Sequence, residues 1–188
     1  MSRISTYPID TVVDTADLLI GTDSEDYNIT KNYTIASIIS LATSGGYINA
    51  AVAVDATTLT PIAEASTFYF LEGTLVTSVS KLWAVGTGVD VNKIIYSGTA
   101  SQVTNIISTV NILASMNTVI NIALFKNDTE IAGTRQKIMI PSTTVPASVC
   151  LQTINTVLAD DVISVKVMTI ASTNDVTATH YNISATLV

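Results

Sequence analysis

The sequence predicts a mainly β fold: an antiparallel β-sandwich or jelly roll preceded by a small hairpin-plus-helix segment. Ile, Val and Thr are abundant, and β-branched side chains fit the pleated, half-buried surface of a strand. Apolar and polar residues alternate in several stretches at intervals of roughly ten residues, which is typical of antiparallel sandwiches. From residue 53 onward no strand-like stretch is followed by a convincing helix, which argues against a parallel βαβ sheet.

The first 46 residues predict a strand, a turn, a second short strand and a helix. The apolar run Leu18–Ile20 is followed by the turn-rich polar residues 21–26. Thr34 is a suitable N-cap for a helix of about two turns over residues 35–42. One apolar stripe along that helix has the spacing i, i+3, i+4 and i+7: Ile35, Ile38, Ile39 and Ala42.

Such a small unit cannot build a core of its own. A two-turn helix is too short to be stable alone, and the segment has no disulfide or metal to compensate. Its apolar side chains must pack either on the rest of the chain or on a separate protein, and both alternatives are open. The candidate docking residues are Leu18, Leu19, Ile20, Ile35, Ile38 and Ile39.

The paired glycines Gly45 and Gly46 mark the boundary, because glycine ends a helix easily and leaves a pliable joint. We therefore predict a segment over 1–46, a linker over 47–52 and a head domain over 53–188.

The head is predicted to consist of strands throughout. Alternation is clearest in 120–124, 162–170 and 181–187, and Lys126–Thr129 forms a hairpin turn. Further strands are expected at 67–71, 75–79, 93–96, 104–113, 135–140 and 148–154.

Composition excludes several classes of function. Charged residues are 12% of the chain, and 8 basic against 15 acidic residues give a net charge of −7, so a phosphate-binding stripe is not expected. One Cys and one His provide neither a disulfide framework nor a Cys/His zinc site. No apolar run reaches the roughly 18 residues of a membrane span, and Met1–Asp10 contains no secretory signal. We expect no enzyme activity, metal, cofactor, nucleic-acid partner or membrane insertion.

Individual candidate residues have simple structural explanations. His180 lacks the context of a Ser-His-Asp site and is interpreted as a solvated or hydrogen-bonded residue at a strand end. Cys150 is expected to be a buried, inert thiol. The acidic residues 23–26 lack the glycine and distal Glu of a calcium loop, so a solvated turn is expected. Trp83 either stacks on a ligand such as a sugar ring or fills one end of the sandwich.

The opening segment resembles the amino-terminal end of many bacteriophage fibre and spike proteins. The resemblance lies in Ala16–Asp23, with the sequence ADLLIGTD, and Thr30–Ile38, with the sequence TKNYTIASI. It implies that this hairpin-plus-helix docks on a virion.

The remainder resembles the trimeric jelly roll of the tumour-necrosis-factor and complement-head type, which recurs at the tips of phage fibres. The resembling stretches are Ser66–Phe70, Asn121–Asp128, Ala159–Val167 and the terminal YNISATLV. A high apolar fraction with few charges also suggests buried subunit faces, since obligate interfaces resemble a core cut in half. A closed ring of three is the expected oligomer.

Together the two resemblances imply a non-enzymatic structural protein of a bacteriophage virion: a short trimeric fibre or decoration protein at the virion surface. The N-terminus would bind other virion proteins of the capsid, portal or tail. The alternative is a receptor-binding tip that recognises a host-surface glycan or protein through head loops, with Trp83 as a candidate contact. A secreted jelly roll of a cell is a third alternative, against which the missing export signal and the phage-like beginning argue.

Overall fold

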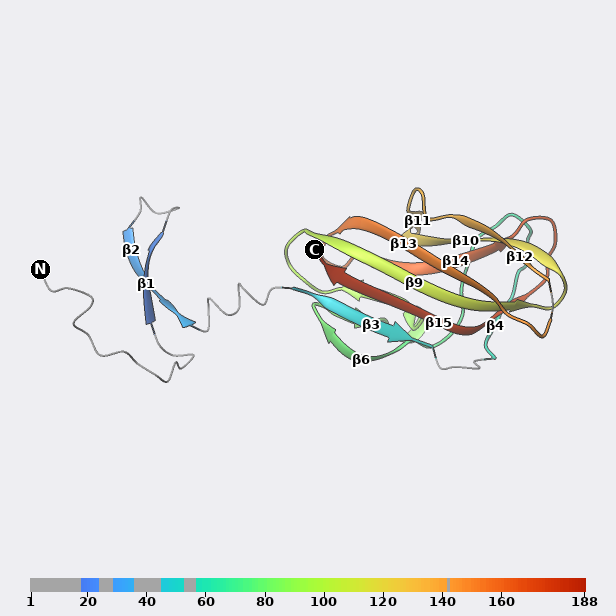
Figure 1. Cartoon of the computed structure of the whole chain (residues 1–188), viewed down its shortest axis with the longest axis horizontal. Helices are drawn as coiled ribbons and strands as arrows, with labels where there is room; N and C mark the ends of the chain where they lie inside the picture. The colour runs from blue at the N-terminus through green and yellow to red at the C-terminus, as the bar shows by residue number, and fades with distance from the viewer. Residues whose placement is uncertain (1–17, 24–28, 36–44, 53–56, 142) are drawn as a thin grey trace, which may run out of the picture. The chain divides into compact units, whose positions relative to one another are not determined.

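The computed structural model describes residues 18–23, 29–35, 45–52, 57–141 and 143–188 of the chain (Figure 1). The chain divides into two compact units, residues 1–44 and 45–188, which are described separately. No helix in these described ranges is long and apolar enough to cross a membrane.

The first unit contains an antiparallel hairpin. Strand β1 (Leu18–Asp23) pairs with β2 (Ile29–Thr34) from the Leu18–Thr34 pair to the Asp23–Ile29 pair. Ile35, the first residue of the predicted helix, is helical. The rest of that helix, with Ile38 and Ile39, and the acidic turn beyond Asp23 lie outside the described residues.

One of the two sheets of the second unit is antiparallel and has six strands. Its order is β13 (Ala147–Val157), β9 (Gln102–Ala114), β15 (Val176–Leu187), β3 (Tyr47–Ala51) and β6 (Val76–Lys81). The two-residue strand β4 (Leu59–Thr60) also pairs with β15. The C-terminal strand therefore lies in the middle of the sheet (Figure 1).

The second sheet has seven antiparallel strands. Its main path is β11 (Thr129–Glu130), β10 (Thr118–Lys126), β14 (Val162–Thr169), β8 (Lys93–Tyr96) and β7 (Trp83–Val85). Strand β12 (Gln136–Ile140) pairs with β10, and β5 (Tyr69–Phe70) pairs with β14. A single-turn 3-10 helix, Gly88–Asp90, lies between β7 and β8.

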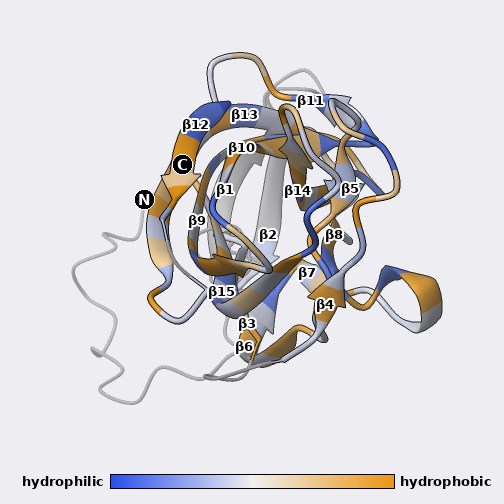
Figure 2. Ribbon diagram, turned by 90° about the vertical axis from the view of Figure 1, so that its right-hand side faces the viewer, coloured by the Kyte–Doolittle hydropathy of each residue, from blue (hydrophilic) through white to orange (hydrophobic). Residues whose placement is uncertain are grey.

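The two sheets enclose one hydrophobic core, seen along the strands in Figure 2. Ile106 and Ile112 of β9, Ile120 and Leu124 of β10 and Tyr181 of β15 are completely buried. The Tyr181 hydroxyl donates a hydrogen bond of 2.7 Å to the Asn92 carbonyl, so its polar atom is satisfied inside the core. Burial raises the pKa of this phenol far above its usual range. The predicted fold class, an antiparallel sandwich of jelly-roll type, is confirmed.

The structure extends the head toward the N-terminus. Residues 47–51, which we expected to be a linker, form β3 between β15 and β6. Ile48, Ala50 and Val52 are buried at alternate positions, as a half-buried strand requires. The small side chains of this stretch made it look like a linker. Residues 83–85, for which we predicted no strand, form β7.

The predicted hairpin turn is confirmed. Lys126 pairs with Thr129, and Asn127 and Asp128 have φ angles of 47° and 64°. Asn and Asp tolerate this left-handed conformation better than other non-glycine residues. The Asn127 amide donates to Asp161 at 2.5 Å, and its carbonyl oxygen accepts the Val162 N–H at 2.8 Å. The turn is thereby fixed to the start of β14.

We expect this contact to give the head an acid-labile contribution to stability. Burial alone would raise the pKa of the Asp161 carboxyl. Hydrogen bonds from the Leu158 N–H and the Asn127 amide, together with the Lys126 ammonium, outweigh burial and hold that pKa below its usual value. The stabilisation is complete above the pKa of an unfolded Asp, about 3.9, and is lost as the pH falls through the lower folded pKa. Asp161→Asn should therefore lower the free energy of unfolding by about 1–3 kcal/mol at pH 7.

Urea unfolding of the wild type and of Asp161→Asn at pH 7, 4 and 3 checks this expectation. The difference between the two proteins should shrink only below about pH 4. An equal difference at all three pH values would show that the carboxylate charge plays no part.

Candidate functional site: the uncharged face of the six-stranded sheet

Charged residues are distributed unequally between the two sheets. Strands β3, β9, β13 and β15 contain no Asp, Glu, Lys or Arg. In the seven-stranded sheet, β8, β10, β11, β12 and β14 each contain at least one. A sheet face in contact with water ordinarily carries Lys and Glu among its outward residues. The six-stranded sheet therefore has an unusual outer face.

Strand alternation decides which side chains form this face. On β13, for example, Val149 and Leu151 are buried while Ser148, Cys150 and Gln152 are exposed. We call the outward set of the four strands the uncharged face. It comprises Tyr47, Asn49, Ala51, Val103, Asn105, Ile107, Thr109, Asn111, Ser148, Cys150, Gln152, Ile154, Thr156, His180, Asn182, Ser184 and Thr186.

Hydrogen bonds between neutral side chains tie these strands together across the uncharged face. The Asn182 amide donates to Asn49 Oδ1 on β3 at 2.9 Å, while Asn182 Oδ1 accepts from the Thr109 hydroxyl on β9 at 3.0 Å. The Ser148 hydroxyl on β13 donates to Asn111 Oδ1 on β9 at 2.7 Å. These contacts hold the side chains in fixed positions, and none of them depends on an ionisable group.

Apolar side chains lie among these neutral groups. Tyr47 is 44% exposed and Ile154 65% exposed. The neighbouring edge strand β6 adds Val76 and Val79, 68% and 55% exposed, on the same side as Asn49 and Ala51; β6 also carries a cation, Lys81. The uncharged face thus presents neutral amides, hydroxyls and β-branched side chains, and no carboxylates. Another protein surface can cover such a face at little cost, because no charged group has to lose its water.

The outer side of the seven-stranded sheet is built differently. Lys166 of β14 is only 8% exposed, contacts Asp128 at 2.9 Å and lies 4.0 Å from the ring centre of Phe70. This ammonium lowers the pKa of the Asp128 carboxyl. Lys93 likewise contacts Asp90 at 2.6 Å and lies 4.0 Å from the Phe70 ring centre. The two ammonium groups lie over the Phe70 ring of β5, and their charges are paired with Asp128 and Asp90.

Of the predicted site residues, the structure describes four docking candidates and the candidate ligand contact. Leu18, Leu19 and Ile20 lie in β1, and Ile35, partly buried, directly follows β2. Trp83 was a candidate ligand contact, but it is only 3% exposed and packs on Tyr96 with ring centres 5.1 Å apart. A side chain so deeply buried cannot stack on a sugar, so Trp83 is a core residue.

Two further interpretations require correction. Cys150 is exposed, not buried, because it occupies an outward position between Val149 and Leu151 on the edge strand β13. His180 lies within β15, not at its end. It is opposite Asn111 at a bulge, and its Nδ1 is buried with no hydrogen-bond partner in the described parts of the chain. Among the residues that the structure describes, no three His, Cys, Asp or Glu side chains gather as metal ligands would.

The sheet order defines the second unit as a two-sheet antiparallel jelly roll, and several solved structures are similar to it. They include murine APRIL at pH 8.0, with 9% identity over 77% of this chain and 99% of that chain and a TM-score of 0.47. The PRD1 vertex protein P5 is 13% identical to this chain, with a TM-score of 0.44. The match covers 76% of this chain and 96% of that chain. Eiger TNF from S. frugiperda is 13% identical to this chain, with a TM-score of 0.45. The match covers 76% of this chain and 93% of that chain.

No protein-family model and no curated protein matches the sequence. Because the structural matches have such low identities and TM-scores below 0.5, we draw no conclusion about function from them.

Proposed function

We propose that the protein is a non-enzymatic structural component of a bacteriophage virion, a short trimeric fibre or decoration protein with an exposed jelly-roll head. The observation that carries the trimer in this proposal is the uncharged face, which combines four strands free of Asp, Glu, Lys and Arg with exposed apolar residues such as Ile154. Obligate subunit interfaces are depleted in charge and enriched in apolar area in the same way. The virion assignment rests on the resemblance of Ala16–Asp23 and Thr30–Ile38 to the amino-terminal ends of phage fibre and spike proteins.

Within this proposal, the uncharged face of each head packs against a neighbouring copy. A contact between different patches must close into a ring or grow into a filament, and three copies form a small closed ring. The neutral network of Asn49, Thr109 and Asn182 would enter such an interface with its hydrogen bonds already made. Burial of these groups then leaves few polar atoms unpaired.

The N-terminal unit would attach the trimer to capsid, portal or tail. Six apolar side chains, Leu18, Leu19, Ile20, Ile35, Ile38 and Ile39, are available for that contact. At about 1.5–3 kcal/mol each when fully buried, they supply a gross free energy on the order of 10 kcal/mol before ordering costs. Three linked copies bind more tightly than one because the second and third contacts are intramolecular.

The double substitution Ile38→Asp with Ile39→Asp tests attachment. We expect the variant to fold and to trimerise like the wild type, because the head is a separate compact unit. It should be at least about tenfold depleted from purified particles, because two buried carboxylates cost several kcal/mol. Quantitative immunoblotting of particles measures this, with Ile38→Val plus Ile39→Val as the matched control. Normal incorporation of the Asp variant would contradict the docking role.

A receptor-binding tip is the second candidate function, and the direction of the strands favours it. Residue Gly45, where the second unit begins, lies next to the C-terminal end of β15. The β9–β10 turn, residues 115–117, and the β14–β15 connection, residues 170–175, lie at the other end of the sheets (Figure 1). Within the head, these loops are therefore at the end opposite to the one where the chain enters it.

A further inference from the structure

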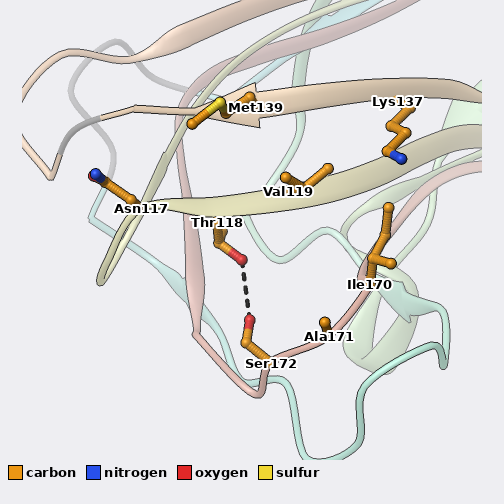
Figure 3. Close-up of a pocket in the computed structure, with 8 residues that line it drawn as sticks. All are labelled: Asn117, Thr118, Val119, Lys137, Met139, Ile170, Ala171 and Ser172. Atoms are coloured by element: carbon orange, nitrogen blue, oxygen red, sulfur yellow. Dashed lines mark hydrogen bonds between the residues drawn. The ribbon is translucent and has the colours of Figure 1, made fainter.

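A pocket of about 320 Å³ lies at the loop end of the head, on the outer side of the seven-stranded sheet. Paired strands β10 and β12 contribute Val119, Met139 and Lys137, and the segment after β14 contributes Ile170 and Ser172 (Figure 3). The Ile170 N–H donates to the Val119 carbonyl at 3.1 Å, which fixes that segment against β10. The volume is at the lower end of the range for small-molecule sites, roughly 300–1,000 Å³.

The pocket contains an ammonium group whose charge is not neutralised nearby. Lys93, Lys126, Arg135 and Lys166 each contact a carboxylate. Lys137 makes no such contact with any residue that the structure describes, and no acidic residue lines the pocket. Figure 3 shows its side chain reaching toward the space beside Ile170. An unpaired cation at the edge of a concave surface attracts an anionic group of a ligand.

The other lining groups are neutral hydroxyls, an amide and aliphatic side chains. The Thr118 and Ser172 hydroxyls are 3.0 Å apart, and only one of them can donate to the other. The hydroxyl that accepts keeps its own proton; Thr118 is buried and Ser172 half-buried, so Ser172 is the more accessible of the two to a ligand. Asn117 adds an amide, while Val119 and Met139 supply an apolar surface, with Met139 63% exposed.

We propose that this pocket binds a carboxylated sugar of a cell-surface polysaccharide. A sugar ring presents hydroxyls and an apolar C–H face together, which matches the Thr118–Ser172 pair beside Val119 and Met139. Lys137 selects the acidic ring over a neutral one by a charge-assisted hydrogen bond to its carboxylate. None of the described residues that line the pocket is aromatic, so each site binds weakly and several copies on one particle provide the avidity.

This inference names the ligand class for the second candidate function and rests on that function for the origin of the sugar. Binding is measured on the purified full-length chain. Failure to bind would therefore contradict the pocket assignment while leaving attachment to particles and trimer formation as they are.

Methyl NMR titrations with glucuronate and with glucose test the proposal. We expect saturable shifts of the Met139 and Ile170 methyl signals with glucuronate, and a dissociation constant at least about tenfold higher for glucose. Lys137→Gln should raise the dissociation constant for glucuronate at least about tenfold. Lys137→Arg, which retains the charge, should stay within about threefold of the wild type.

Three results of these titrations would overturn the proposal. They are the absence of saturable shifts at the pocket, equal affinity for glucuronate and glucose, and unchanged affinity in Lys137→Gln. Octanoate serves as an additional probe, and tighter binding of octanoate than of glucuronate would assign the pocket to an acyl carboxylate instead. Because Lys137 is exposed and makes no ion pair with the described residues, its variants should fold normally, and a wild-type amide spectrum confirms this.

Discussion

If the protein is the trimer that we propose, Thr109→Lys is expected to convert it to a monomer without unfolding the head. Thr109 lies on the uncharged face, exposed in the single chain, between Cys150 of β13 and Asn182 of β15. A lysine at this position would remain solvated in the monomer but would be buried without a partner in the assembly. An unpaired buried charge costs several kcal/mol. We therefore expect the dissociation constant of the subunits to rise at least about 100-fold.

The matched control is Thr129→Lys, which introduces the same charge at an exposed position of β11 on the other sheet. Sedimentation velocity and circular dichroism of both variants separate loss of assembly from loss of fold. A trimeric Thr109→Lys protein would show that the uncharged face is not the subunit interface.

Trp83→Ala is expected to lower the free energy of unfolding by about 3–5 kcal/mol, the range for removal of a large buried aromatic side chain. Trp83 is 3% exposed and packs on Tyr96, which is itself 1% exposed. Its loss would leave a cavity at the β7–β8 pair that these rigid strands cannot fill. Chemical denaturation followed by circular dichroism measures the change.

Trp83→Phe serves as the control, because it keeps an aromatic ring against Tyr96 and should cost less than Trp83→Ala. The Trp83 Nε1 atom is buried and has no hydrogen-bond partner among the residues that the structure describes, so phenylalanine also removes an unsatisfied donor. The chain has one Trp, and its fluorescence should be blue-shifted in the folded wild type. A loss below about 1 kcal/mol in Trp83→Ala would contradict a core role.

The long strands of the head could be predicted because their local pattern is strong. Strands β9, β10, β13 and β14 lie where alternation or an apolar run indicated them, and the Asn127–Asp128 turn has its own signature. Strand β3 was missed because Ala50 and Ala51 provide little contrast between buried and exposed positions. Strand β4 has only two residues, too few to show a period.

The uncharged face could not be located from local patterns. The scarcity of charge was visible in the sequence, but its concentration on one sheet depends on which strands become neighbours. Asn182 and Asn49 are hydrogen-bonded although they are 133 positions apart in the chain. A comparison of charge between the predicted strands would not have separated β9, β13 and β15 from the predicted strands 67–71, 75–79 and 120–124, which are also free of charge.

Burial of single residues depends on the same long-range pairing. Trp83 is buried because β7 pairs with β8, which places it against Tyr96. Cys150 is exposed because β13 uses its other side chains, Val149 and Leu151, to cover the core. Neither outcome follows from the residue type, since tryptophan and cysteine are both usually buried to a large extent.

The native mass of the wild-type chain in solution tests the central claim most directly. Size-exclusion chromatography with multi-angle light scattering at micromolar concentration should give three times the chain mass of 19.8 kDa. A stable particle of 19.8 kDa under those conditions would contradict the proposal that the uncharged face is a subunit interface.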